Sequence, residues 1–205
     1  MQCLMLTKSS LAIALSRLDV FDRPDLLSEQ YPTDSEVAAE ALWQAYMLGD
    51  IKGKSIIDLG AGTGILGIGA LLLGARSCKF VEIEPEAVKT LRANLRGLGL
   101  KSRIIQSEIN LFEGSADVVI QNPPFGTKTI HADRDFLIKA MASAPVVYSF
   151  HKAATQTFIE KIAEKNGFCE THCWQYAFPL KRTHNHHTRR IHKIDVRLHR
   201  LIRIL

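Results

Sequence analysis

Short apolar segments alternate with helical segments along residues 55–165, and this alternation is the strongest constraint on the fold. Strands are predicted at 55–59, 79–83, 103–106, 116–120 and 146–150, and helices at 65–73, 85–98, around 136–141 and at 153–165. Parallel neighbouring strands need a crossover connection, which is usually a helix. The pattern therefore predicts an α/β fold with a mostly parallel sheet and helices on both faces.

The two ends of the chain extend this predicted architecture. Residues 169–176 and 193–204 alternate as strands do, which predicts a C-terminal antiparallel hairpin and a seven-stranded sheet. Near the N-terminus, residues 9–18 have helical spacing, and Thr33-Asp34-Ser35-Glu36 resembles a capping box for a helix at 37–48. No linker or repeat divides the chain. We therefore expect one domain over residues 1–205, with 1–50 as an N-terminal helical segment.

The composition excludes several classes of protein. The chain has 205 residues, of which 46% are hydrophobic, so it can bury a core and is not a disordered protein. The longest apolar stretch, residues 65–75, contains glycines and is shorter than the roughly 18 to 20 residues that cross a bilayer. A signal peptide is not indicated, and the four cysteines are too scattered for a disulfide framework. A cytoplasmic protein without a membrane partner is expected.

Positive charge is concentrated near the C-terminus. The net charge is +5, yet residues 181–203 carry eight Lys or Arg against one acidic residue, Asp195, which makes this segment +7 and the rest of the chain −2. A basic segment on a mildly acidic body favours contact with a polyanion such as nucleic acid. A solvated basic edge strand is the alternative interpretation.

A glycine-rich loop follows the first predicted strand. Asp58-Leu59-Gly60-Ala61-Gly62-Thr63-Gly64 leads directly into a helix, so its glycines permit a tight turn and let backbone N–H groups approach a ligand. Glu82 lies 22 residues after Gly60, where such folds have an acid that binds ribose hydroxyls. These features predict a nucleotide-type site at the carboxyl edge of the sheet. A dehydrogenase and a purely structural turn are the alternatives.

A second motif, Asn122-Pro123-Pro124-Phe125, follows the fourth predicted strand. With the glycine loop, it resembles the signature of S-adenosylmethionine-dependent amino-methyltransferases. Hydrogen bonds from an exocyclic amine to the Asn122 side-chain carbonyl and the Pro123 backbone carbonyl favour a tetrahedral nitrogen with a free lone pair. The prolines hold these carbonyls rigidly, and Phe125 offers a face for a splayed base. A Pro-Pro turn with Phe125 in the core is the alternative.

The wider set of motifs is similar to a narrower family. It comprises Glu29-Gln30-Tyr31-Pro32-Thr33, the glycine loop, Asn122-Pro123-Pro124-Phe125-Gly126-Thr127-Lys128 and Tyr148-Ser149-Phe150-His151-Lys152. Spread over nearly the whole chain, these motifs resemble the methyltransferase-like family that makes N6-methyladenosine in small-subunit ribosomal RNA. The resemblance implies a Rossmann-like class I methyltransferase fold, S-adenosylmethionine as cofactor and RNA as substrate.

The resemblance also implies a set of cofactor contacts. Two residues of the N-terminal segment contact the cofactor, the glycine loop surrounds its methionine portion, Glu82 holds the ribose and Glu108 reads the adenine. The full implied set is Gln30, Thr33, Asp58, Gly60, Gly62, Thr63, Ile65, Glu82 and Glu108. The family usually has Asp at the last two positions and a cysteine in the loop, departures that should tune affinity without removing binding. An ordinary N-cap is an alternative role for Thr33.

Basic residues near the motif and in the tail are the expected RNA contacts, with the segment 181–203 as an RNA-binding hairpin. They are Lys128, His151, Lys152, Lys181, Arg182, Arg189, Arg190 and Lys193. For His151 and Lys152, a solvent-facing pair at the end of a strand is an equal alternative. Phosphate contacts would position the RNA while the Asn122 loop selects the base.

The sequence does not predict a zinc site. Cysteine and histidine residues near the C-terminus include typical zinc ligands, namely Cys169, His172, Cys173, His184, His186 and His187. No second cysteine pair completes a tetrahedral set, and cysteines four apart on a strand are expected to share one face. We therefore expect two small core cysteines and a histidine-rich basic loop.

Three other functions are open alternatives to RNA adenine methylation. A protein glutamine N5-methyltransferase shares the amine chemistry, but it leaves the basic tail unexplained. A DNA adenine-N6 methyltransferase would lack room for a target-recognition domain in 205 residues. A non-catalytic RNA-binding module conflicts with the intact Asn122 motif. Some relatives also need a small zinc-containing activator protein that pairs with a sheet edge, a partner that this sequence does not reveal.

Overall fold

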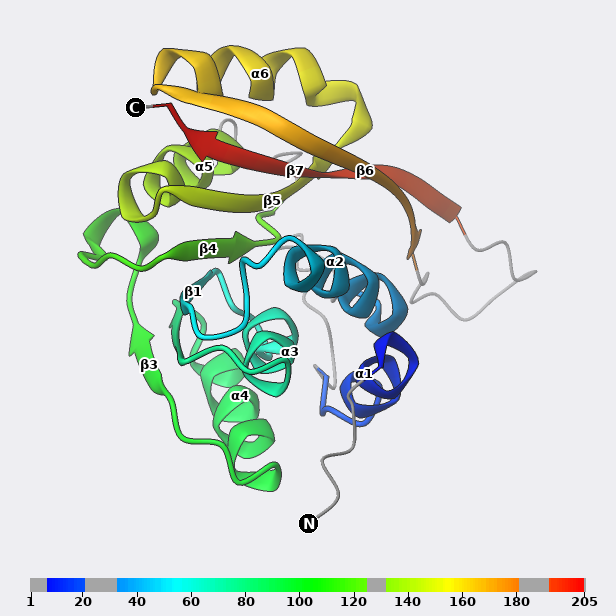
Figure 1. Ribbon diagram of the computed structural model, residues 1–205. Helices are drawn as coiled ribbons and strands as arrows, with labels where there is room; N and C mark the ends of the chain where they lie inside the picture. Colours follow the sequence, from blue (N-terminus) through cyan, green and yellow to red (C-terminus); the bar gives the residue numbers. More distant parts are fainter. Residues whose placement is uncertain (1–6, 21–32, 125–131, 181–191, 205) are drawn as a thin grey trace, which may run out of the picture.

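The computed structural model of this chain describes residues 7–20, 33–124, 132–180 and 192–204 (Figure 1). Two N-terminal helices, α1 (Lys8–Leu15) and α2 (Ser35–Met47), precede the sheet. The remaining elements follow the predicted alternation: β1 (Ser55–Leu59), α3 (Ile65–Leu72), β2 (Ser77–Glu82), α4 (Pro85–Gly97), β3 (Arg103–Gln106), β4 (Val118–Gln121), α5 (Ala132–Ser143), β5 (Val146–Lys152), α6 (Gln156–Lys165), β6 (Phe168–Leu180) and β7 (His192–Arg203). Two short 3₁₀ turns, Ile109–Leu111 and Ala153–Thr155, lie between them.

All seven strands belong to one sheet with the order β3-β2-β1-β4-β5-β7-β6. The first five are parallel to their neighbours, whereas β7 is antiparallel to both β5 and β6. The predicted fold class is therefore confirmed, including the C-terminal hairpin. The strand order reverses between β1 and β4, and open parallel sheets bind ligands at the carboxyl edge beside such a point.

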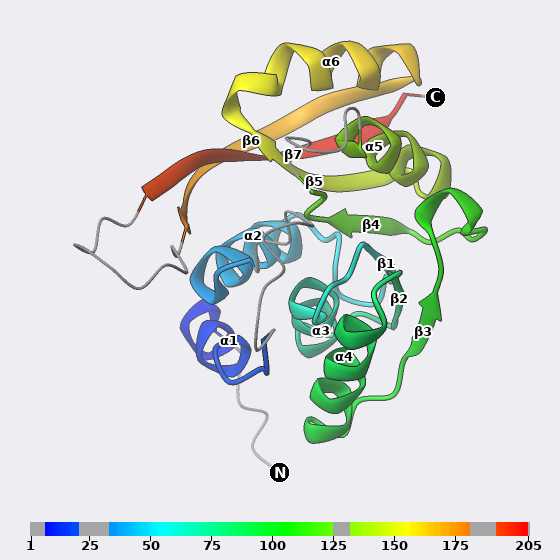
Figure 2. The same ribbon diagram turned by 180° about the vertical axis from the view of Figure 1, so that it is seen from behind.

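The sheet is covered on both faces, as Figures 1 and 2 show. One core contains buried side chains of α1, α2, α3 and α4, including Leu11, Leu42 and Leu91. The other contains side chains of α5 and α6, including Leu137 and Ile159. Within the described residues, no helix is long and apolar enough to span a membrane.

The start of α2 differs from the predicted capping box. Asp34 is the N-cap, and its carboxylate accepts hydrogen bonds from the backbone N–H groups of Glu36 and Val37. The hydroxyl of Thr33 is instead bonded to Asn122. Because an aspartate satisfies the free N–H groups at a helix start as well as threonine does, the neighbouring threonine is released for the site.

A β-bulge between Glu170 and His172 corrects the predicted arrangement of the two C-terminal cysteines. Cys169 pairs with Ile202 and Cys173 with His199, two partners that lie three positions apart on β7. Successive side chains of a strand alternate between faces, so the two cysteines lie on opposite faces of the sheet. Simple alternation along β6 had placed them on one face.

Candidate active site

The fold brings the two predicted motifs together at the carboxyl edge of the central strands. In the register between β1 and β4, Asp58 pairs with Ile120, so the glycine loop and Asn122 leave the sheet side by side. Glu82 ends β2, on the other side of β1. Glu108 follows β3 at the same edge and is exposed. The sequence-predicted residues of the described chain thus converge on one edge of the sheet.

The glycine loop is held by hydrogen bonds within the protein. Gly60, Gly62 and Gly64 all have positive φ angles of 72°, 55° and 93°, which L side chains rarely adopt. The N–H groups of Gly60 and Ala61 donate to the Val81 carbonyl, both at 2.9 Å. These amides were expected to approach a ligand; instead they shape the loop. Thr63 in the loop is buried, and Ile65, the first residue of α3, is half-buried.

Glu82 is a buried residue, 6% exposed, and organises this edge through its carboxylate. One oxygen accepts from the Gly62 N–H at 2.6 Å, and the other accepts from the N–H groups of Ile83 at 2.8 Å and Glu84 at 2.9 Å. A carboxylate offers about four acceptor positions. The described residues fill three of these positions, so Glu82 fixes the loop and has one further acceptor position.

Asp58 supports the loop from inside the core. Its side chain is 1% exposed and accepts a hydrogen bond from the Gly67 N–H in α3 at 2.8 Å. Burial raises the pKa of Asp58 to about 8; the hydrogen bond from Gly67 opposes this rise and the nearby Glu82 carboxylate adds to it. A Cβ at Gly67 would lie 2.9 Å from an Asp58 oxygen, so glycine is needed for this approach. Asp58 therefore joins strand to helix, a role different from direct cofactor contact.

Asn122 has a fixed amide and a free carbonyl oxygen. Its Nδ2 donates to the Thr33 hydroxyl at 2.9 Å. Its Oδ1 is buried and has no hydrogen-bond partner among the described residues. Leaving a buried acceptor unpaired is costly, so such an atom marks a place where a ligand donor fits. Thr33 was predicted to contact the cofactor, and in the structure it orients the amide of Asn122.

Asn94, which belongs to none of the sequence motifs, ties the N-terminal segment to the glycine loop. Its buried side chain accepts from the Asp19 N–H at 2.9 Å and donates to the carbonyls of Asp19 and Thr63, each at 3.0 Å. Residues 19–20 are thereby held beside the loop. An asparagine on the otherwise apolar face of α4 was the available signal in the sequence.

A row of buried polar side chains begins next to Asn122. Gln121 donates to the Ser149 hydroxyl at 2.8 Å, and that hydroxyl is 2.6 Å from Nε2 of His151. The His151 ring in turn packs edge-on against His199, with 5.8 Å between centroids. These contacts anchor the strand that carries the Asn-Pro-Pro motif to β5 and β7.

The structure corrects the expectation for His151. Strand β5 continues to Lys152, and the His151 side chain is 1% exposed instead of facing a phosphate or solvent. Burial lowers its pKa to about 3, with the His199 imidazole acting in the same direction. Lys152 is half-buried and ends the strand. Other predicted residues lie outside the described backbone or have undescribed side chains: Gln30, Phe125, Lys128, Lys181, Arg182, Arg189, Arg190 and Lys193.

Two arginines of the basic tail have structural partners. The Nε of Arg200 donates to the Asp50 carboxylate at 2.8 Å and to the Tyr148 hydroxyl at 3.0 Å, within the core. Arg203 donates to the Met141 carbonyl at 2.8 Å. Part of the positive charge counted in the tail therefore stabilises the hairpin and does not face a polyanion.

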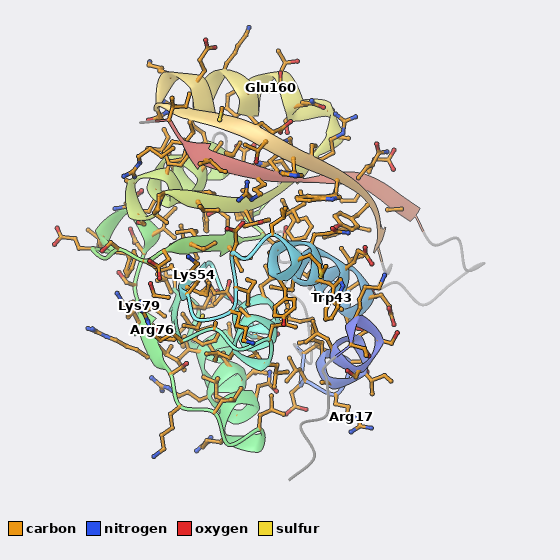
Figure 3. All side chains as sticks on the ribbon, viewed as in Figure 1. Arg17, Trp43, Lys54, Arg76, Lys79 and Glu160 are labelled. Carbon is orange, nitrogen blue, oxygen red and sulfur yellow. The ribbon has the colours of Figure 1, made fainter. Side chains whose placement is uncertain are left out.

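Further positive charge gathers at the opposite, amino edge of the sheet. Figure 3 shows Lys54, Arg76 and Lys79 close together near the starts of β1 and β2. Arg76 is 3.3 Å from the Asp117 carboxylate, and Lys79 donates to the Ser115 carbonyl at 3.1 Å. These three basic residues lie near the amino ends of the strands, whereas the Asn122 motif lies at the carboxyl ends.

The sheet order, the glycine loop and the Asn-Pro-Pro motif at its carboxyl edge define a Rossmann-like class I methyltransferase. Residues 28–172 match the family described as Conserved hypothetical protein 95. The chain is 34% identical to the Drosophila melanogaster rRNA N(6)-adenosine-methyltransferase Mettl5, over 89% of this chain and 90% of that protein. The chain belongs to this family of rRNA N(6)-adenosine-methyltransferase relatives.

Archaeal proteins are also similar to this chain. The uncharacterized protein MJ0284 of Methanocaldococcus jannaschii is 32% identical over 96% of this chain and 94% of its own length. The solved structure of PH1948 from Pyrococcus horikoshii, provisionally assigned as an RNA methyltransferase, is 42% identical with a TM-score of 0.90 and covers 97% of this chain and 98% of its own. The similarity therefore extends over the whole fold.

Proposed function

We propose that this chain transfers a methyl group from S-adenosylmethionine to the N6 amino group of an adenine in small-subunit ribosomal RNA. The observation that carries the proposal is the Asn122 amide, whose nitrogen is bonded to Thr33 while its buried oxygen is unpaired among the described residues. The amino-methyltransferase chemistry needs an acceptor of this kind. The names of the relatives, which are rRNA N(6)-adenosine-methyltransferases, supply the substrate class.

The residues of the Asn122 motif would act on the substrate amine. Oδ1 of Asn122 and the Pro123 carbonyl accept hydrogen bonds from the two N–H groups of the adenine amine, which favours a nitrogen with an available lone pair. Pro123 is buried and has no N–H of its own to compete. No strong base is required, because the amine loses its proton only after it has gained the methyl group. Phe125 is proposed to stack on the base.

The described residues fit S-adenosylmethionine, which supplies an electrophilic methyl group when bound. Glu82 is buried at the carboxyl edge and keeps one acceptor position, which suits a ribose hydroxyl. Glu108 stands at the next strand end and suits the adenine amine. The loop from Gly60 to Ile65 would surround the methionine portion. Gln30, which lies outside the described residues, is proposed to complete the site.

Labelled methyl transfer to unmodified small-subunit ribosomal RNA tests the proposal, with DNA and ribosomal protein in parallel. Label should be recovered as N6-methyladenosine. Asn122→Ala should lower the rate by about 100-fold or more, because one preorganised transition-state hydrogen bond is lost, with cofactor affinity unchanged. Asn166→Ala is the matched control, since Asn166 ends α6 at the opposite edge and only donates to the Ile162 carbonyl.

Four results would contradict parts of this assignment. Label on a protein glutamine would favour the amide methyltransferase, and label only on DNA would favour a DNA adenine methyltransferase. Full activity of Asn122→Ala would remove the catalytic role of that amide. Cofactor binding without transfer to any of these substrates would favour a binding module.

The activator protein and the location of the chain are further parts of the proposal. The sheet ends in β3 on one side and β6 on the other, and an edge strand offers unpaired backbone groups to a partner. Activity of the purified chain alone would show that no activator is needed. A cytoplasmic location agrees with the free thiols of Cys78, Cys169 and Cys173.

A further inference from the structure

The hairpin contains a cluster of three possible metal ligands, and its nearer strand, β7, is separated from β4 by β5 in the sheet order. Glu170 and Cys173 come from β6, and His199 comes from β7. One ligand atom of each residue lies within 4.8 Å of the others. We propose that these three side chains form a binding site for a zinc ion.

The bulge in β6 creates this cluster. Glu170 pairs with Leu201 and Cys173 pairs with His199, two positions of β7 that are on the same face. In a regular strand without the bulge, Glu170 and Cys173 are three positions apart and would point to opposite faces. Bulges often re-aim side chains at functional sites. Here the bulge places carboxylate, thiol and imidazole together.

The distances suit one ion after a small rearrangement. Sγ of Cys173 is 3.9 Å from Nδ1 of His199, and the Glu170 carboxylate forms a hydrogen bond with the same nitrogen. Ligand bonds of about 2.0 to 2.3 Å in a tetrahedron separate two ligand atoms by about 3.3 to 3.8 Å. His199 is fully buried and fixed, whereas Cys173 is exposed and can rotate.

The chemistry of the donor set favours zinc over calcium or magnesium. Thiolate, imidazole and carboxylate are the common zinc ligands, whereas the harder ions prefer oxygen alone. The exposed side of Cys173 leaves room for water as the fourth ligand. An ion at this position would crosslink β6 to β7, the two strands that flank residues 181–191.

This ligand set differs from the one suggested by the sequence. Cys169 faces the opposite side of the sheet, and His172 is bonded to Thr171. Glu170 and His199 are 29 residues apart, with no short spacing that marks a zinc motif. Only the antiparallel register brings them together.

Cobalt titration of the full-length chain tests the site, because cobalt bound to a thiolate shows a charge-transfer absorption band. The chain should be prepared without a histidine tag, stripped with a chelator and titrated with Co²⁺ and then Zn²⁺. One equivalent of Co²⁺ should produce the band, Zn²⁺ should displace it, and Zn²⁺ should raise the unfolding temperature. Cys173→Ser should abolish the band, and Glu170→Gln should weaken affinity by about tenfold or more.

Two control variants keep the test specific. Cys169→Ser should retain the band, because Cys169 lies on the other face. A triple variant with His184, His186 and His187 replaced by Ala should also retain it, which separates the site from the histidine-rich segment. The proposal fails if the wild-type chain shows no band, if Cys173→Ser keeps it, or if the triple variant loses it. Circular dichroism of each variant shows whether it is folded.

Discussion

The glycine loop and the C-terminal hairpin hold their polar groups in different ways. In the loop, acidic side chains accept from backbone N–H groups close in sequence: Gly67 to Asp58 over 9 residues and Gly62 to Glu82 over 20. In the hairpin, buried side chains bond to one another over long separations, such as 150 residues between Arg200 and Asp50. Local motifs build the first region, and sheet assembly builds the second.

The two regions also differ in what stabilises them. Backbone N–H groups that solvate a carboxylate belong to a preformed turn, so the loop depends on its glycine conformations. The hairpin depends on charged side chains that lose water and must pair with each other. Each of the following tests addresses one of these dependences.

Removal of the buried arginine should have the largest effect. Arg200→Met leaves the Asp50 carboxylate and the Tyr148 hydroxyl without their shared donor, which should lower the free energy of unfolding by about 3 to 5 kcal/mol. Urea unfolding monitored by circular dichroism measures this loss. Lys89→Met is the matched control, because the Lys89–Glu86 pair is exposed and should matter little. Similar small losses in both variants would contradict the importance of the buried pair.

The loop conformation should be nearly as sensitive. Gly64→Ala imposes a φ of +93° on alanine and drives a Cβ to within 2.2 Å of Leu91, so we expect about 2 to 4 kcal/mol of destabilisation. Gly97→Ala adds a Cβ in open space within α4 and should stabilise by up to about 1 kcal/mol. Thermal and urea unfolding of the two variants measure the contrast. A neutral Gly64→Ala would show that the loop tolerates side chains.

The Glu82 carboxylate should be needed for both the loop and the proposed cofactor. Glu82→Gln places an NH₂ group against backbone N–H donors, which should cost about 1 to 3 kcal/mol in the ligand-free chain. Calorimetry should also show weaker binding of S-adenosylmethionine. Loss of binding with unchanged stability would mean that Glu82 contacts only the ligand and does not hold the loop.

The buried Asp58 should give a pH dependence of stability with a definite sign. The pKa of Asp58 is about 8 in the folded state and about 3.9 in the unfolded state. The contribution of Asp58 to the free energy of unfolding is therefore complete below pH 4 and is lost as the pH rises towards 8. Asparagine does not ionise, so the Asp58→Asn variant does not lose stability in this way. Between pH 5 and 8 the stability of the variant relative to wild type should therefore rise, by up to about 1.4 kcal/mol per pH unit.

Urea unfolding at several pH values in this range measures the difference between the two proteins. His151 has the opposite sign, because its lowered pKa gives a contribution that is present above about pH 6.5 and lost as the pH falls towards 3. It is common to both proteins and cancels in the difference. A flat difference between pH 5 and 8 would contradict a raised pKa at Asp58.

Much of the candidate site could be predicted because its parts are local. Strand β1 and the glycine loop occupy adjacent positions, and the Asn-Pro-Pro motif follows β4 directly. Parallel topology then places all strand ends at one edge. The partners of Asn122 and Gln121 could not be predicted, since Thr33 and Ser149 lie 89 and 28 residues away.

The alternation of strands and helices, the turn made by Gly60, Gly62 and Gly64, and the family can all be predicted from the amino-acid sequence, because they depend on residues close along the chain. Which polar groups are buried and paired becomes visible only in the folded sheet. His151 lies inside because β5 is covered on both faces, and the bulge in β6 turns Glu170 and Cys173 to the face of His199. Burial and cross-strand register arise from the whole sheet, and no local pattern encodes them.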